Sequence, residues 1–319
     1  MNKKILVTGA AGFIGSFLCE ELVSHNYFVI GIDNFFRGEK ENLCALENNP
    51  LFLLFEMDLC EVGNIGKINK LLNDYKIDTV MHFAAINGTQ YFYDRPLFVM
   101  DQNIRMTQNL LLAIENTGVK SIIYASSSEV YGDPEKFPTD EQSPILLYES
   151  YDRDSYAVSK ASSEFYVRLF AKQHNIASLT LRIFNTYGER MVGTCYGQVI
   201  PEFINRMLFE EKFTILGDGK HTRSFCYVKD SVCMIRALME KQIAGLVNLG
   251  CDDEMSMLAL AKKIHDIAQQ SFYPEFLPER PNDHQRRKPD ISHLKRLLGP
   301  LSFTPLAIGL KRMIDFYSV

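Results

Sequence analysis

Seven short runs of apolar residues recur along this chain, and they limit its fold more than any other feature. Each run is four to six residues long, rich in β-branched or aromatic side chains and largely apolar on both faces, as buried strands of a parallel sheet are. The runs are residues 4–7, 28–32, 52–55, 79–83, 121–125, 178–183 and 246–249. Segments with the apolar spacing of helices, such as 107–114, lie between them. This alternation predicts an α/β fold with a doubly wound parallel sheet.

A glycine-rich segment directly follows the first run and opens the first helical segment. Its glycines, Gly9, Gly12 and Gly15, permit a tight turn and let the backbone approach a pyrophosphate at a helix N-terminus. Small residues at such a turn can also mean only tight packing. The position between a strand and a helix favours a dinucleotide site, with Phe13 and Ile14 beside the glycines, and hence a Rossmann fold.

Acidic residues follow the second and third runs. Asp33 can accept hydrogen bonds from both hydroxyls of a ribose and would repel a 2′-phosphate, which favours NAD over NADP. Arg37 nearby would instead attract that phosphate. Asp58 and Leu59 would suit the adenine edge, although a helix N-cap explains Asp58 equally well. We therefore expect NAD as the cofactor, contacted by Asp33, Asp58 and Leu59.

Tyr156 and Lys160 stand four residues apart, on one face of a predicted helix. A lysine beside a tyrosine favours the phenolate, which makes the phenol a usable base near neutral pH. Ser127 and Glu129 follow the fifth run, at the carboxyl edge of the sheet where a nicotinamide should lie. A surface helix pair and a turn would explain the two motifs separately. Their order on this scaffold favours one catalytic group formed by Tyr156, Lys160, Ser127 and Glu129.

The composition of the chain changes after Phe184, where glycines, aromatics and later prolines become frequent. We expect a smaller α/β C-terminal lobe that binds substrate over the carboxyl edge of the sheet. The predicted division gives residues 1–183 plus 224–252 to an NAD-binding Rossmann domain and 184–223 plus 253–319 to the lobe. Cys195 reads as a packing residue rather than a nucleophile, because no histidine is placed in sequence to activate it.

The chain resembles the extended short-chain dehydrogenase/reductase family, which contains the nucleotide-sugar epimerases, dehydratases and decarboxylases. The resemblance covers essentially the whole chain. Its motifs are Gly9 to Gly15, His82 to Ala85, the Ser127 region, Tyr156 with Lys160, Arg182 to Gly188, Gly217 to Gly219, Arg223 to Val228 and Arg286 to Ile291. The resemblance implies an NAD-dependent enzyme that oxidises a nucleotide-diphosphate sugar transiently at C4, in a redox-neutral reaction.

The resemblance also implies what the catalytic residues do. Tyr156 would deprotonate the sugar 4-hydroxyl while hydride passes to NAD, and Ser127 would share that hydrogen bond. Lys160 would also hold the nicotinamide ribose. Tyr156 and Ala84 would contact the cofactor as well.

Three polar residues in the second half are expected to bind the substrate. By the resemblance, Asn185, Arg223 and Arg287 would contact the diphosphate or the sugar. The two arginines suit this role because a planar, permanently charged guanidinium binds phosphate bidentately. Arg286 reads as an ordinary surface charge.

The step after C4 oxidation differs within the family. The 4,6-dehydratases carry Thr-Asp-Glu where this chain has Ser127, Ser128 and Glu129, and the pKa of Ser128 is too high for the acid that dehydration needs. The uronic-acid decarboxylases keep a hydroxyl-Ser-Glu sequence there and closely match the arginine motifs. UDP-glucuronate decarboxylation is therefore favoured, with Ser128 at the substrate and Arg287 and Glu129 as candidate proton donors.

Alternatives to decarboxylation stay open. A nucleotide-sugar 4-epimerase follows closely, because Asn87 and Thr89 lie in a segment unlike the decarboxylase pattern and could touch the sugar. Glu189 also stands where the family usually has proline. A 4,6-dehydratase ranks third. The non-enzyme alternative is a catalytically inactive NAD-binding regulator, which the joint presence of Tyr156 and Lys160 disfavours.

The composition limits the kinds of partner that this protein is expected to bind. A formal net charge of −5 gives no basic field for nucleic acid or an acidic membrane, and no apolar run approaches the ~20 residues of a membrane span. The seven cysteines are scattered and read as reduced, and the seven histidines form no ligand-spaced cluster, so no metal is expected. We expect a cytoplasmic protein. Helical segments 104–114 and 164–171 would form a four-helix bundle in a homodimer, or simply cover the sheet.

Overall fold

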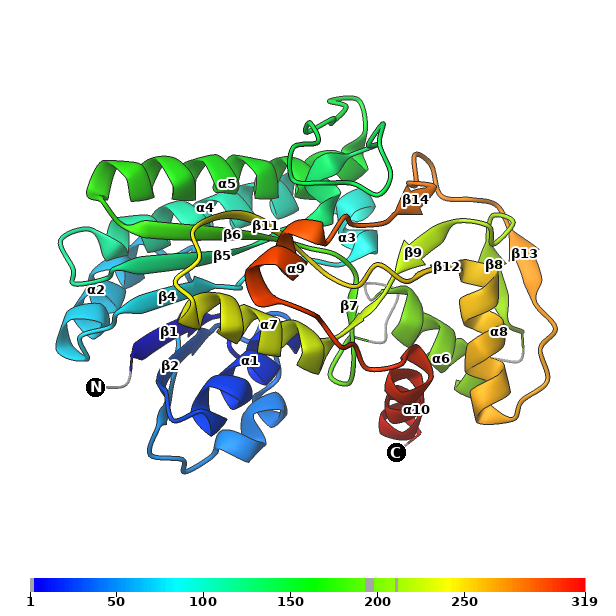
Figure 1. Cartoon of the computed structure of the whole chain (residues 1–319), viewed down its shortest axis with the longest axis horizontal. Helices are drawn as coiled ribbons and strands as arrows, with labels where there is room; N and C mark the ends of the chain where they lie inside the picture. The colour runs from blue at the N-terminus through cyan, green and yellow to red at the C-terminus, as the bar shows by residue number, and fades with distance from the viewer. Residues whose placement is uncertain (1–2, 193–197, 210–211, 319) are drawn as a thin grey trace.

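A seven-stranded parallel sheet forms the centre of the molecule (Figure 1). The computed structural model describes residues 3–192, 198–209 and 212–318, so the prediction for Cys195 lies outside the described residues. In order across the sheet, the strands are β11 (Gly245–Leu249), β6 (Ala177–Ile183), β5 (Ser121–Ser127), β4 (Thr79–His82), β1 (Lys4–Thr8), β2 (Phe28–Asp33) and β3 (Phe52–Glu56). These are the seven apolar runs of the sequence, and the predicted α/β fold is confirmed.

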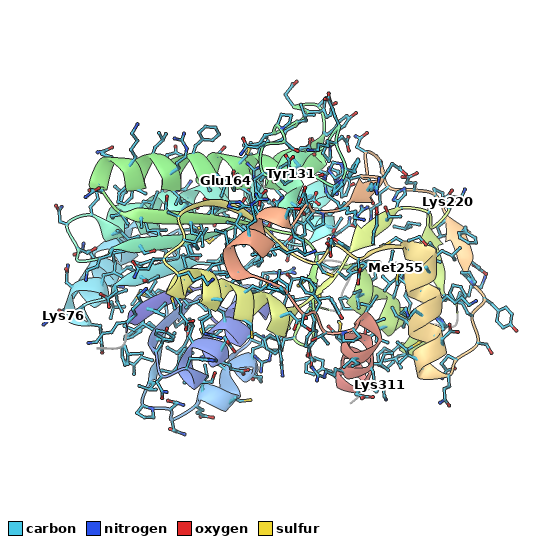
Figure 2. All side chains as sticks on the ribbon, in the orientation of Figure 1. Lys76, Tyr131, Glu164, Lys220, Met255 and Lys311 are labelled. Atoms are coloured by element: carbon cyan, nitrogen blue, oxygen red, sulfur yellow. The ribbon has the colours of Figure 1, made fainter. Side chains whose placement is uncertain are left out.

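Helices cover both faces of the sheet because its strands are apolar on both faces. One face packs against α2 (Ile65–Asp74), α4 (Pro96–Ile114) and α5 (Ser155–His174), and the other against α1 (Phe13–Ser24) and α7 (Val228–Glu240). The alternation within β1 shows this division. Ile5 and Val7 belong to the apolar core shared with α1 and α7, and Leu6 belongs to the core shared with α2 and α4. In Figure 2 side chains fill these layers, and Lys76 and Lys220 lie at opposite ends of the molecule.

Smaller elements lie beyond the carboxyl edge of the sheet (Figure 1). The helices there are α3 (Thr89–Asp94), α6 (Val199–Phe209), α8 (Met257–Ala268) and α10 (Leu306–Tyr317). Helix α9 (Ser292–Leu298) instead packs against β11 and α7. The short strands are β7 (Thr186–Tyr187), β8 (Thr214–Leu216), β9 (Thr222–Ser224), β10 (Cys226–Tyr227), β12 (Glu254–Ser256), β13 (Glu275–Leu277) and β14 (Arg286–Arg287). They match the expected α/β lobe, while the exact residue division between domain and lobe stays a prediction.

Pairing of β9 with β14 brings distant parts of the chain together. The two strands are parallel, and Arg287 lies opposite Arg223 in their register. β9 also pairs with β12, which makes a three-stranded sheet. The two arginines of the predicted substrate site therefore stand on adjacent strands.

Candidate active site

The turn after β1 brings the backbone very close to its neighbours. Gly9 has a φ of +70°, a conformation that favours glycine. A Cβ at Gly15 would lie 1.9 Å from the carbonyl oxygen of Gly9, and a Cβ at Gly9 would lie 2.7 Å from the backbone nitrogen of Ala84. Helix α1 then begins at Phe13, with Gly12 as its N-cap. The turn thus presents a helix N-terminus that no side chain covers, which suits a pyrophosphate.

Replacing Gly15 with alanine is expected to abolish NAD binding, because the added methyl group would displace the turn by way of the Gly9 carbonyl. Titration of the purified variant with NAD, followed by calorimetry, checks this. Gly66→Ala in α2 is the matched control, because a Cβ there meets nothing within 4 Å. Equal NAD affinity of the Gly15→Ala variant and the wild type would contradict this account of the turn.

Asp33 closes the turn from the end of β2. Its Oδ2 accepts a hydrogen bond from the backbone N–H of Ala11 at 2.9 Å, and its Oδ1 accepts one from Phe35 at 2.8 Å. Burial raises the pKa of Asp33, although these backbone donors oppose the shift. Each carboxylate oxygen keeps a second lone pair beside the cavity that the residue lines. The residues present therefore fit a ribose with two free hydroxyls, as in NAD.

Of the other two residues expected around the adenosine, Asp58 lines the cavity and Leu59 does not. Asp58 lines the cavity, accepting hydrogen bonds from the backbone N–H of Cys60 at 2.7 Å and the side chain of Asn34 at 3.1 Å. The helical turn that follows has Glu61, not Asp58, as its N-cap. The side chain of Leu59 packs in the core and its carbonyl accepts from Asn109, so the structure does not bring that side chain to the cavity.

Lys160 and Tyr156 lie at the start of α5, as the four-residue spacing predicts. The ammonium of Lys160 donates to the carbonyl oxygen of Ala125 at 2.8 Å and lies 5.9 Å from the centre of the Tyr156 ring. Burial lowers the pKa of Lys160 to about 7, although the charge of Glu164 opposes the shift. The Tyr156 ring stacks on Phe92 with their centres 4.7 Å apart, which fixes the direction of its hydroxyl.

Protein groups alone do not give Tyr156 the low pKa that the sequence reasoning expected. Burial raises the pKa of Tyr156, the charge of Glu129 raises it further, and only a hydrogen bond with Ser127 lowers it. Desolvation is the largest of these effects because the phenolate would lie in a buried site. The positive nicotinamide of bound NAD⁺ would add the charge that favours the phenolate.

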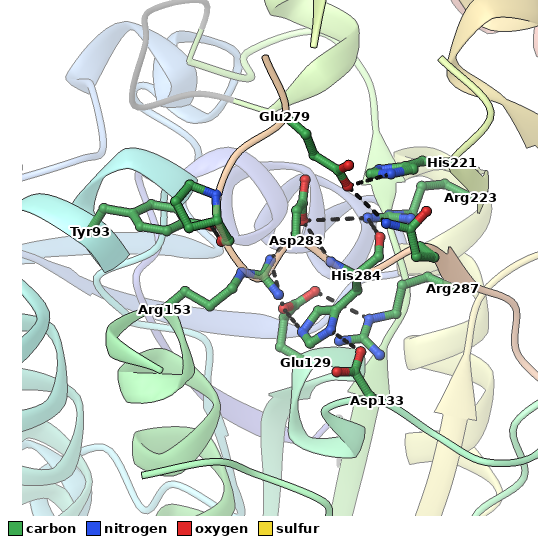
Figure 3. Close-up of polar contacts among 12 residues, drawn as sticks. Tyr93, Glu129, Asp133, Arg153, His221, Arg223, Glu279, Asp283, His284 and Arg287 are labelled. Atoms are coloured by element: carbon green, nitrogen blue, oxygen red, sulfur yellow. Dashed lines mark hydrogen bonds and ion pairs between the residues drawn. The ribbon is translucent and has the colours of Figure 1, made fainter. Parts of the chain in front are cut away.

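Glu129 stands at the centre of a cluster of charged residues (Figure 3). Its carboxylate lies 3.4 Å from Arg287, 3.4 Å from Arg153 and 3.6 Å from His284. Burial alone would raise the pKa of Glu129, but the guanidinium groups of Arg287 and Arg153 hold it well below its usual range. Glu129 is therefore ionised at neutral pH and cannot store a proton, which corrects its candidacy as the resting proton donor.

Arg287 is buried and Arg223 is half-buried, and of the two only Arg223 lines the cavity. Arg223 donates to the carbonyl oxygens of Thr222 at 2.9 Å and His284 at 2.6 Å. Arg287, only 2% exposed, lies behind Glu129 and donates to the carbonyl oxygen of Gly132. Arg287 therefore holds Glu129 from behind and is not among the residues that line the cavity, and its expected contact with the substrate stays a prediction.

One continuous cavity of about 610 Å³ joins these groups, a size typical of ligand pockets. Of the residues predicted to bind cofactor or substrate, or to act in catalysis, the following line it: Gly9, Gly12, Phe13, Ile14, Gly15, Asp33, Asp58, Ala84, Asn87, Thr89, Ser127, Ser128, Glu129, Tyr156, Lys160, Asn185 and Arg223. Arg286 instead lies at the surface in an ion pair with Glu254, as expected.

Sequence reasoning missed Arg153, Asp283 and His284. Arg153 lines the cavity and its Nη2 lies 3.3 Å from Asp283 and 3.4 Å from Glu129. A signal for Arg153 existed, because Arg153, Tyr156 and Lys160 are spaced as one helix face. Asp283 and His284 come from a long connection before β14, where no spacing rule points to a site.

Comparison with known proteins identifies the family. Residues 5–250 match the NAD dependent epimerase/dehydratase family. The chain belongs to that family. Among its relatives, UDP-glucuronic acid decarboxylase 1 of Arabidopsis thaliana is 35% identical over 314 residues, which cover 98% of this chain and 69% of the relative.

Solved structures of the family share the fold over the whole chain. A UDP-glucuronic acid 4-epimerase of Bacillus cereus, in complex with UDP-glucuronic acid and NAD, is 32% identical with a TM-score of 0.88 and covers 99% of both chains. A UDP-N-acetylglucosamine 4-epimerase of Methanobrevibacter ruminantium M1 is 30% identical with a TM-score of 0.90, over 99% of this chain and 98% of that one. The protein is therefore an NAD-dependent enzyme of the nucleotide-sugar epimerase, dehydratase and decarboxylase group.

The described residues also bear on membrane and metal binding. No helix within residues 3–192, 198–209 and 212–318 is long and apolar enough to cross a membrane. Over the same residues, no group of His, Cys, Asp and Glu side chains could hold a metal ion.

Proposed function

We propose that this enzyme removes carbon dioxide from a UDP-uronate, with UDP-glucuronate as the favoured substrate. The observation that carries the proposal is the pair of Arg153 and Glu129 on the cavity wall beside Tyr156. A sugar whose C4 meets Tyr156 directs its C5 substituent toward these neighbours. A carboxylate at C6 would gain a charge-assisted contact with Arg153, whereas the hydroxymethyl group of a neutral hexose has no need of a buried cation.

The residues divide the chemistry between oxidation and decarboxylation. Tyr156 as phenolate takes the proton of the 4-hydroxyl, Ser127 shares that hydrogen bond, and Lys160 in its protonated form places positive charge near the phenol. NAD, bound at the glycine turn and Asp33, takes up the hydride from C4 and later returns it. The resulting 4-keto uronate is a β-keto acid, which loses carbon dioxide once it is formed.

A nucleotide-sugar 4-epimerase is the second candidate. Arg287 lies behind Glu129 rather than at the cavity, so it stands away from the C5 atom that decarboxylation must protonate. Epimerisation needs no such proton, and it uses the same Tyr156 and Lys160. Dehydration ranks third, because Ser128 lines the cavity where an acid would be needed.

Product analysis decides between these reactions. The purified enzyme is incubated with NAD and UDP-glucuronate, and the nucleotide-sugar products are followed by mass spectrometry. We expect a UDP-pentose that has lost one carbon dioxide. An unchanged mass with an altered sugar would show epimerisation, and loss of water would show dehydration.

We also propose that the enzyme is a homodimer of the cytoplasm. Apolar side chains on the outer surface of α4 and α5 support the homodimer. Phe165 and Leu169 are 53% and 52% exposed on adjacent turns of α5, and Leu112 is 49% exposed on α4. Two copies could bury these faces in a four-helix bundle. The free thiols of the six described cysteines fit a reducing compartment.

The double variant Phe165→Glu with Leu169→Glu is expected to be monomeric, because charge on both residues opposes burial of the α5 face. Light scattering coupled to gel filtration measures the mass in solution. Tyr273→Glu is the control, because Tyr273 is also exposed but lies before β13, far along the chain from α5. A monomeric wild type, or a double variant that stays dimeric, would count against this interface.

A further inference from the structure

The proposed reaction consumes a proton that Tyr156 and Lys160 do not supply. When the C5–C6 bond of the 4-keto uronate breaks, carbon dioxide leaves and the electron pair of that bond passes into an enolate over C5, C4 and O4. C5 then takes up one proton, and C4 regains its hydride. The proton that Tyr156 took from O4 returns to O4. One further proton per turnover must therefore reach C5 from solvent.

Glu129 is the residue at which such a proton can enter the cavity. Its side chain is 24% exposed and lines the cavity beside Tyr156, whereas Arg287 lies behind it. Because Glu129 is ionised at neutral pH, it can accept a proton and pass it on, but it cannot hold one in reserve. A supply of protons on the outer side of Glu129 is needed.

His284 connects Glu129 to the surface (Figure 3). The His284 side chain is only 3% exposed, with Nδ1 2.5 Å from an oxygen of Asp133 and Nε2 3.6 Å from an oxygen of Glu129. Asp133, at the outer end, is 53% exposed. His284 Nε2 is buried and makes no hydrogen bond, although a carboxylate stands in front of it. A buried nitrogen without a hydrogen bond lowers the stability of the fold, which points to a functional role.

The backbone on both sides holds the ring between the two carboxylates. The N–H of His284 donates to Asp283 at 2.9 Å, and its carbonyl accepts from Arg223 at 2.6 Å. Both partners line the cavity. The position of the imidazole is therefore tied to the substrate site rather than to a free loop.

We infer that Asp133, His284 and Glu129 form a proton path from solvent to C5 of the substrate. A solvent proton enters at Asp133 and is taken up by Nδ1 of His284, while Nε2 releases a proton to Glu129, which passes it to C5. The ring then carries its proton on Nδ1, and exchange of that proton for one on Nε2 restores the starting tautomer before the next turnover. The inference rests on the proposed decarboxylation, because epimerisation consumes no proton.

The charges that face the ring keep it in the form that such a path needs. Burial and the guanidinium of Arg287 lower the pKa of His284, Arg153 acts in the same direction, and the carboxylates of Glu129 and Asp133 oppose them. A neutral imidazole has one N–H and one lone pair, so it can accept a proton on one side and release one on the other.

His284→Gln tests the path, because the amide keeps a polar group of similar reach but cannot carry a proton. The variant, with NAD, is mixed with UDP-glucuronate in a stopped-flow instrument, and the NADH absorbance and carbon dioxide release are followed. We expect the absorbance to rise as fast as in the wild type and to decay slowly, with turnover about 10- to 100-fold lower. Asp133→Asn should also slow the decay of the NADH absorbance.

His265→Gln is the matched control. His265 is also 3% exposed, lies in α8 away from the cavity lining, and bonds through Nδ1 to the carbonyl oxygen of Ala261. Its replacement should leave both phases of the absorbance unchanged.

Two results would overturn the path. Unchanged turnover of His284→Gln would show that the imidazole carries no proton, and a slower rise of the absorbance would show that His284 only positions the site. A wild-type enzyme that releases no carbon dioxide would overturn the proposed function itself, and that result is seen without any variant.

Discussion

Replacement of Tyr156 with phenylalanine should lower turnover about 1000-fold or more, since the 4-hydroxyl then has no base. The ring keeps its stacking on Phe92, so NAD affinity should stay at the wild-type value. Addition of the nucleotide sugar to the variant should produce no NADH absorbance, while calorimetry with NAD should give an unchanged binding curve.

A second stacked tyrosine provides the control for this experiment. Tyr75 stacks on Phe28 with ring centres 5.8 Å apart, and it does not line the cavity. Tyr75→Phe should leave turnover unchanged. Wild-type turnover by Tyr156→Phe would remove the phenol from the mechanism.

Replacement of Glu129 with glutamine is the second change with a large expected effect, here on stability. Glu129 is the shared anion of Arg287 and Arg153, whose side chains are only 2% and 5% exposed. Removing its charge leaves buried Arg287 without its anionic partner and Arg153 with Asp283 alone, so we expect the free energy of unfolding to fall by about 3 kcal/mol. Urea denaturation followed by circular dichroism measures this difference.

The same change from acid to amide in an exposed ion pair is the control for loss of charge alone. Asp74 pairs with Lys70 at 2.7 Å, with the two side chains 51% and 75% exposed. Asp74→Asn should leave the urea midpoint unchanged, because an exposed pair is screened by water. If Glu129→Gln is as stable as the wild type, the cluster does not depend on Glu129 for its balance of charge.

The sequence predicts most of the sheet, because its strands carry a local signal. Buried parallel strands must be apolar on both faces, so 28–32 or 121–125 can be read without knowing their neighbours. The glycine turn and the spacing of Tyr156 and Lys160 are equally local. These parts of the site could be predicted, and the cavity brings them together.

Other parts of the site depend on contacts between segments far apart in the sequence. His284 meets Glu129, 155 positions away in the sequence, only because β14 pairs with β9, and no periodicity encodes that pairing. Whether a residue such as Leu59 or Arg287 faces the cavity or the interior is also decided by packing. Burial likewise determines the pKa of Tyr156, and burial is not visible in a four-residue spacing.

Deuterated water reveals whether decarboxylation takes a proton from solvent. The wild-type enzyme is incubated with NAD and UDP-glucuronate in D₂O, and the product is examined by mass spectrometry and proton NMR. We expect a UDP-pentose that has lost one carbon dioxide and carries one deuterium at C5. A UDP-uronate of unchanged mass, inverted at C4 and free of deuterium on carbon, would contradict it.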